Sequence, residues 1–185
     1  MATTEQREAL DDALSGTLSR TIDFLKFAET KNAALLTFSS AWLLALTNLL
    51  TSDRLAHHGP RTAIAVSLLL FAVAALVALY SFLPKLKLAA IQRDPERQKS
   101  LLFFGDISEF DATTYATRFS ERYASNPEQA ISDDYLKDLA VQVAANSLIT
   151  LRKFNLFNLG AAFVLAALLV LTATAGWVTY YGLWK

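Results

Sequence analysis

Long uncharged blocks dominate the pattern of hydrophobic and polar positions along the chain. Residues 32–52, 62–84 and 154–184 contain no charged side chain. A helix needs about 20 apolar residues to cross a hydrocarbon core roughly 30 Å thick. Each block is long enough, and a backbone inside a bilayer must satisfy its own hydrogen bonds. The pattern therefore predicts three transmembrane helices.

The alternative is a soluble protein in which these helices are buried. The chain has only 185 residues, of which 54% are hydrophobic. A soluble fold would need a much larger polar shell around three such helices. The first 25 residues also lack the apolar core of a signal peptide, so we expect no cleaved leader.

Positive charge sets the predicted orientation. Lys and Arg are retained on the cytoplasmic side of membranes. Ten of them lie in residues 85–153 and four in residues 1–31, whereas the turn at 53–61 has two. We therefore expect the N-terminus and residues 85–153 in the cytoplasm, with the turn and the C-terminus outside.

Aromatic residues near the C-terminus agree with this orientation, because amphipathic rings prefer the membrane interface. They are Trp177, Tyr180, Tyr181 and Trp184. Trp42 is an exception, since it falls at the midpoint of the first span. We expect it to pack against a neighbouring helix.

Two of the spans continue predicted water-facing helices. Residues 4–31 form an amphipathic helix, and a second one begins at Ser132, a predicted N-cap. The apolar stripe of the first contains Leu10, Leu14, Leu18, Ile22 and Leu25, and that of the second contains Leu136, Leu139, Ala140, Val143, Ser147, Leu151 and Phe154. Neither helix is separated from its span by a proline. The fold class is thus an all-α membrane protein whose cytoplasmic helical unit is built from extensions of the first and third spans.

The remaining cytoplasmic segment is less regular. It includes a predicted helix at 85–92, which ends before Pro95, and another at 112–123. We expect the two long stripes to face each other, with residues 101–123 packed alongside.

The sequence contains no convincing catalytic set or metal site. His57 and His58 are adjacent in the short turn, where we expect solvated side chains. Asp106, Glu109 and Asp111 fit a solvated helix start better than a metal site. The chain has no cysteine and a net charge of zero, so thiolate chemistry and nucleic-acid binding are not expected. We predict no enzyme activity and no cofactor.

Polar residues on the first span have two interpretations. Thr37, Ser40 and Asn48 lie near one helical face. They either form hydrogen bonds between helices or line a weakly polar pore in a homo-oligomer. The absence of charge in the span excludes a proton relay of the usual kind.

A cluster of cations at the cytoplasmic membrane boundary is the candidate ligand site. Its basic members are Arg20, Lys31, Arg152 and Lys153, and neighbouring rings that could stack on a base are Phe103, Phe104, Tyr115 and Phe119. Such a set could bind a nucleotide phosphate. The simpler explanation is the positive-inside rule.

Three stretches carry a family resemblance. Residues 20–38, 101–108 and 139–154 resemble the corresponding segments of Pycsar effector transmembrane proteins, in the same order around the spans. The resemblance covers most of residues 18–175. It implies an antiphage effector in the bacterial inner membrane.

In that family a partner pyrimidine cyclase senses infection and makes cyclic UMP or cyclic CMP. The effector then impairs the membrane, and the infected cell dies before phage are released. No motif transfers a nucleotide-binding residue to this chain, and residues 85–153 show few strand signals, so any ligand site must be helical. The alternatives are a membrane-anchored scaffold that recruits a cytoplasmic protein and, ranked last, a membrane enzyme.

Overall fold

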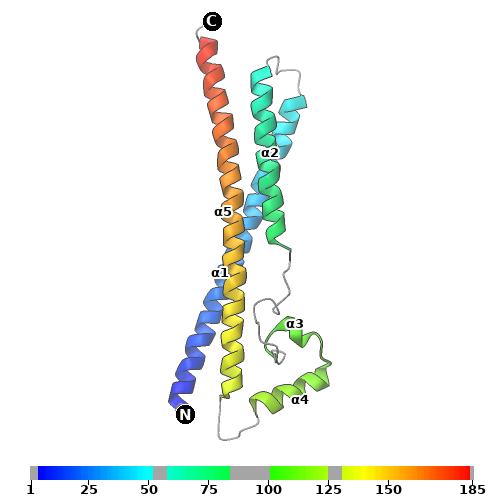
Figure 1. Ribbon diagram of the computed structural model, residues 1–185, viewed down its shortest axis with the longest axis vertical. Helices are drawn as coiled ribbons and strands as arrows, with labels where there is room; N and C mark the ends of the chain where they lie inside the picture. The colour runs from blue at the N-terminus through cyan, green and yellow to red at the C-terminus, as the bar shows by residue number, and fades with distance from the viewer. Residues whose placement is uncertain (1–3, 52–57, 84–100, 125–130, 184–185) are drawn as a thin grey trace. The chain divides into compact units, whose positions relative to one another are not determined.

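The computed structural model describes residues 4–51, 58–83, 101–124 and 131–183 (Figure 1). The helices are α1 (Thr4–Thr51), α2 (His58–Ser81), α3 (Phe104–Ile107), α4 (Ala112–Tyr123) and α5 (Asp133–Leu183). No strand occurs in these four ranges. The predicted all-α class is confirmed.

Three of the helices are long and apolar enough to cross a membrane. They are Thr4–Thr51, Pro60–Ser81 and Asp133–Tyr181. The first and third also contain the predicted water-facing helices without interruption, so the three-span fold with helical extensions is confirmed. The helix expected at 85–92 lies outside the described residues.

Capping side chains fix two helix starts where the sequence predicts them. Asp111 accepts hydrogen bonds from the backbone N–H groups of Thr113 and Thr114, at 3.0 and 2.9 Å, and α4 follows it. The Thr114 side chain, followed by the backbone N–H groups of Thr114 and Thr113, lowers the pKa of the Asp111 carboxyl by hydrogen bonding to it. Ser132 Oγ accepts from the Tyr135 N–H at 3.2 Å and opens α5.

The described chain divides into two compact units. The first contains residues 1–26 and 84–150, and the second contains residues 27–83 and 151–185. Both α1 and α5 contribute residues to each unit within one continuous helix. We call the end of the second unit near Phe27, Ser81 and Leu151 its proximal end, and the end near Thr51 and His58 its distal end.

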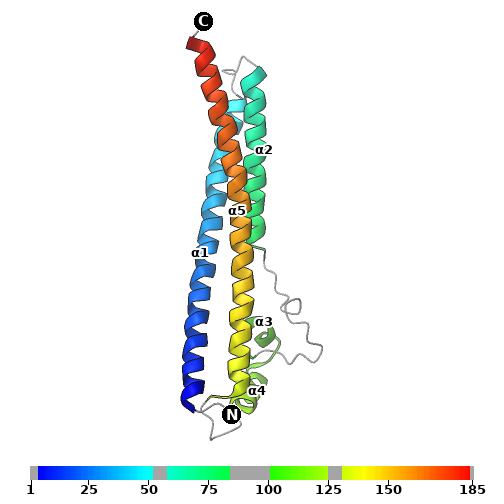
Figure 2. The ribbon, with the colours of Figure 1, turned by 60° about the vertical axis from the view of Figure 1, so that its left-hand side comes forward.

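Buried residues in the second unit recur at alternating steps of three and four, the spacing of helices that pack along one seam. On α1 they include Ala28, Asn32, Leu35, Ser39 and Leu46, on α2 Ile64, Ser67, Phe71, Ala74, Ala78 and Ser81, and on α5 Gly160, Val164 and Ala167. The three helices lie side by side (Figures 1 and 2). Trp42 stacks on Phe71 with ring centroids 5.5 Å apart, which confirms that it packs against a neighbouring helix.

At Gly160, α5 packs closely against both α1 and α2. A Cβ atom at this position would lie 2.6 Å from Leu35 Cδ2 and 3.5 Å from the Ala74 carbonyl oxygen. Small residues at such points let membrane helices pack closely.

Replacing Gly160 with alanine should therefore lower the melting temperature relative to Gly176→Ala, because both variants gain the helix propensity of alanine but only the new Cβ at position 160 requires Leu35 to move. Thermal unfolding of the detergent-solubilised protein measures the effect. Gly176→Ala is the matched control, since a Cβ there meets nothing within 4 Å. Equal melting temperatures for the two variants would contradict the close packing.

The first unit packs α1, α3, α4 and α5 together, but not along all of the predicted stripes. Leu136 and Leu139 are buried as expected, whereas Ala140, Ser147, Leu151 and Leu10 are exposed. The buried face of α5 is rotated toward Asp138 and Ala145, because α4 and Phe103 pack there. A stripe predicted from hydrophobic residues alone does not show this rotation, because it leaves out Asp138, whose carboxylate is buried.

Candidate functional site

The predicted ligand residues fall in both units. Arg20 belongs to the first unit, where its Nε donates to the Gly16 carbonyl at 3.1 Å and the side chain is exposed. Lys31, Arg152 and Lys153 belong to the second unit and lie at its proximal end. The side chain of Phe104 lies outside the described residues. The structure thus places three of the five candidate ligand residues at the proximal end of the second unit.

Lys153 joins three helices at that end. Its ammonium is 3.1 Å from Glu29 Oε1 on α1 and donates to the Ser81 carbonyl oxygen, at the last residue of α2, at 3.1 Å. The Lys153 side chain is only 13% exposed, whereas that of Glu29 is 48% exposed. A cation at a helix C-terminus is favourable, because the last carbonyls lack partners within the helix. We call Glu29, Ser81 and Lys153 the lysine junction.

Asn32 adds a second link between α1 and α5. It is fully buried, and its Nδ2 donates to the Ala28 carbonyl at 2.9 Å and to the Lys153 carbonyl at 3.1 Å. Its Oδ1 is buried without a hydrogen-bond partner among the described residues. A buried amide between helices fixes their register at some expense of stability.

Aromatic rings surround Lys31. Its ammonium lies 4.7 Å from the ring centroid of Phe27, 5.8 Å from that of Phe154 and 5.1 Å from that of Phe157. Arg152 lies over the Tyr80 ring at 5.1 Å. Cation–π contacts of this kind stabilise a positive charge where water is scarce. Lys31 and Arg152 are therefore held in place by rings, whereas Lys153 has an ion pair in addition to the Phe82 ring, whose centroid is 5.6 Å away.

The first unit contains a buried polar cluster that the sequence analysis missed. Asp138 accepts a short hydrogen bond from the Tyr123 hydroxyl and pairs with Arg122 Nη2 at 3.1 Å. Burial, followed by the hydrogen bond to Asp138 and its charge, raises the pKa of Tyr123 far above the usual value. The only sequence signal for this cluster was Asp138 itself, a carboxylate between Leu136 and Leu139 on an apolar stripe.

Replacing Tyr123 with phenylalanine should destabilise the first unit by about 1–3 kcal/mol, because Asp138 would lose a buried donor. Thermal unfolding of the full chain in detergent measures this, with the exposed Tyr181→Phe as control. The raised pKa also predicts that the stability contributed by Tyr123 is fully present below about pH 10, the ordinary pKa of tyrosine. The free energy of unfolding of the wild type should then fall as the pH rises above that value. A Tyr123→Phe protein that keeps the wild-type melting temperature and alkaline profile would contradict this role.

A hollow of about 430 Å³ on α4 provides a second place for a ligand. Tyr115 and Phe119 line it, and their ring centroids are 5.7 Å apart. The Tyr115 hydroxyl is anchored on the Leu101 carbonyl at 3.0 Å. Phe103, another ring predicted to stack on a base, is instead buried against Ala145. Of the described rings predicted to stack on a base, Tyr115 and Phe119 line this hollow.

The predicted pore residues do not belong to the seam between the three helices. Thr37 and Asn48 are exposed on α1, and Ser40 is half-buried. Thr37 Oγ1 donates to the Ala33 carbonyl of its own helix at 3.0 Å. Within the described ranges, no group of three or more His, Cys, Asp or Glu side chains lies close enough to hold a metal.

Comparison with known proteins places these features in a family. A model of the Pycsar effector protein domain matches residues 13–180. The chain is also 39% identical over 154 residues to the Pycsar effector protein RsPycTM of a Rhizobium species, and the match covers 83% of this chain and 87% of the relative. No solved structure matches. The similarity spans both units and all three membrane helices, and the chain therefore belongs to the Pycsar effector family.

Proposed function

We propose that the protein is an antiphage effector of the bacterial inner membrane that a cyclic pyrimidine nucleotide activates and that then impairs the membrane. The observation that carries this proposal is the family match over residues 13–180. Cyclic UMP or cyclic CMP from a partner cyclase is the activating ligand, and death of the infected cell is the outcome. The proposed mode of action involves no enzymatic step.

The proposed orientation follows from the distribution of positive charge. The N-terminus and residues 85–153 are cytoplasmic, where a cyclase product accumulates, and the C-terminus is outside. Lys31 and Arg152 are our candidates for contact with the phosphate, because rings rather than carboxylates hold their charges. Tyr115 and Phe119 line a hollow within the first unit, which is a separate candidate place for a base to stack.

We further propose that the lysine junction restrains the spans until the ligand binds. The junction ties the end of α2 to α1 and α5 through one ammonium. Lys153, the member of the junction on α5, is two residues from Leu151, the first residue of α5 that belongs to the second unit. A ligand-induced movement of either long helix would break these bonds and free the spans to rearrange or assemble into a homo-oligomer.

Isothermal titration of the detergent-solubilised protein tests the activation step. We expect binding of cyclic UMP or cyclic CMP and not of cyclic AMP or cyclic GMP. Binding of none of the four nucleotides would overturn the proposed activation. A stoichiometric cytoplasmic partner in pull-downs, with no effect of expression on membrane potential, would favour the scaffold instead.

A further inference from the structure

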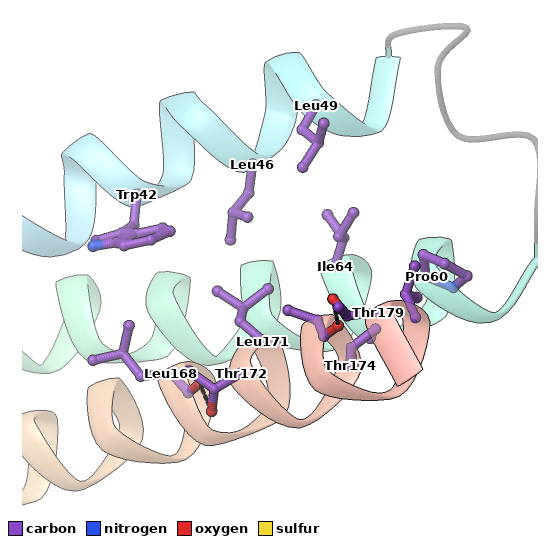
Figure 3. A pocket seen from close by; sticks show the side chains of 13 residues that line it. Trp42, Leu46, Leu49, Pro60, Ile64, Leu168, Leu171, Thr172, Thr174 and Thr179 are labelled. Atoms are coloured by element: carbon purple, nitrogen blue, oxygen red, sulfur yellow. Dashed lines mark hydrogen bonds between the residues drawn. The ribbon is translucent and has the colours of Figure 1, made fainter. Parts of the chain in front are cut away.

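A cavity of about 660 Å³ opens between α1, α2 and α5 near the distal end of the second unit (Figure 3). Leu46 and Trp42 form its α1 wall, and Pro60 and Ile64 contribute from α2 (Figure 3). Protein interiors pack densely, and voids larger than a water molecule are few. A space of this size that is open to its surroundings can take an occupant from them.

The α5 wall of the cavity includes several short side chains. Thr174 and Ala175 face the cavity. Gly160, Val164 and Ala167 are buried in the seam between the helices, further toward the proximal end. Near the distal end, the short side chains of this wall are Thr172, Thr174, Ala175 and Thr179, and Leu168, Leu171 and Val178 also line it.

The chemistry of the lining selects an apolar occupant. The hydroxyls of Thr172, Thr174 and Thr179 donate to carbonyls of their own helix at 2.8 to 2.9 Å. These threonines therefore present methyl groups, and the rest of the lining is mostly aliphatic or aromatic. A cavity of this kind does not hold water well, because water requires two or more polar partners.

The surroundings determine which apolar occupant is available. All three helices are long and apolar enough to cross a bilayer, so hydrocarbon surrounds them. Exposed Trp177 and Tyr181 on α5 lie near the same end, and such rings prefer the depth where acyl chains meet their headgroups. We propose that the cavity is a lipid site that takes an acyl chain of a bilayer phospholipid.

A helix from a second copy fits this lining less well. Membrane helices associate through close backbone contact or hydrogen bonds between helices. Here the threonine hydroxyls are already used within α5, and the cavity is recessed between three helices. A flexible chain can follow that recess, whereas a rigid helix about 10 Å wide cannot.

Trp42 offers a built-in probe, because it lines the cavity. In a Trp177→Phe, Trp184→Phe background it is the one remaining tryptophan. The full chain is reconstituted in vesicles of phosphatidylcholine with or without bromine on the acyl chains. Bromine quenches tryptophan on contact, so we expect strong quenching of Trp42 by the brominated lipid.

A matched pair of variants separates the cavity from the lipid that surrounds the helices. Ala175→Phe places a ring in the cavity, whereas Ala173→Phe adds the same ring two residues away at a position that does not line it. We expect loss of most of the quenching in Ala175→Phe and none in Ala173→Phe. Ala63→Phe, on the α2 wall, serves if Ala175→Phe does not fold.

Three results would overturn the proposal. The first is an unquenched Trp42 in brominated vesicles, and the second is equal quenching in the Ala175→Phe and Ala173→Phe proteins. The third is quenching that appears only when the protein is diluted in lipid, which would identify a second copy as the occupant. None of these readouts depends on a nucleotide, so the proposal can fail while the proposed function stands.

Discussion

Replacing Lys153 with methionine should depolarise the membrane in the absence of any nucleotide. The change removes the ammonium that links Glu29 on α1 to the Ser81 carbonyl at the end of α2. A hydrogen bond to a charged group contributes about 1.5–3 kcal/mol. If the junction holds the resting state, losing it should raise the population of the active state by roughly ten- to a hundredfold.

A potential-sensitive dye in bacteria that express the variant without a cyclase measures this effect. Lys153→Arg keeps the charge and should behave as wild type, and Glu29→Gln should have a weaker effect in the same direction. Lys26→Met is the matched control, because it removes an exposed lysine whose 3.4 Å pair with Asp23 is also exposed. Normal resting potential in the Lys153→Met cells, with full response to nucleotide, would exclude the junction as a restraint.

Replacing Asn32 with aspartate should unfold or strongly destabilise the second unit. The Nδ2 atom that donates to the Ala28 and Lys153 carbonyls would become an oxygen facing two oxygens. A buried charge without a partner costs about 3–5 kcal/mol. Since Asn32 has no exposed surface, water cannot relieve this repulsion.

Thermal unfolding and size-exclusion chromatography of the detergent-solubilised variant test this prediction. Asn155→Asp introduces the same carboxylate at an exposed position of α5, two residues from Lys153, and should change the melting temperature little. A similar loss of stability in both variants would show that the carboxylate acts by its charge alone, and not through the lost link between α1 and α5.

The spans, the long helices and α4 could be predicted because their signals are local. Uncharged length defines a span, and Asp111 or Ser132 followed by helical periodicity defines a helix start. The stacking of Trp42 followed from its depth in the first span. Each of these features depends on residues that are close together in the sequence.

The contacts between helices could not be predicted, because they join residues far apart in the chain. Arg7 pairs with Asp133 at 2.7 Å, and Asn32 reaches Lys153 across 121 positions. The sequence does not show that Glu29 on α1 pairs with Lys153 on α5, so it does not separate Lys153 from Lys31 and Arg152 in the predicted ligand site. A pattern of residue types predicts which face of a helix is apolar, but not how the neighbouring helix is rotated against it. The contact between Tyr123 on α4 and Asp138 on α5 was therefore not predicted.

The most direct test of nucleotide activation is the membrane potential of vesicles that contain only the purified protein. A potassium gradient sets the potential, a dye reports it, and cyclic UMP, cyclic CMP or cyclic AMP is added. We predict that one of the two pyrimidine nucleotides collapses the potential, that cyclic AMP does not, and that protein-free vesicles stay polarised. A potential that persists with both pyrimidine nucleotides, in vesicles shown to contain folded protein, would contradict the account.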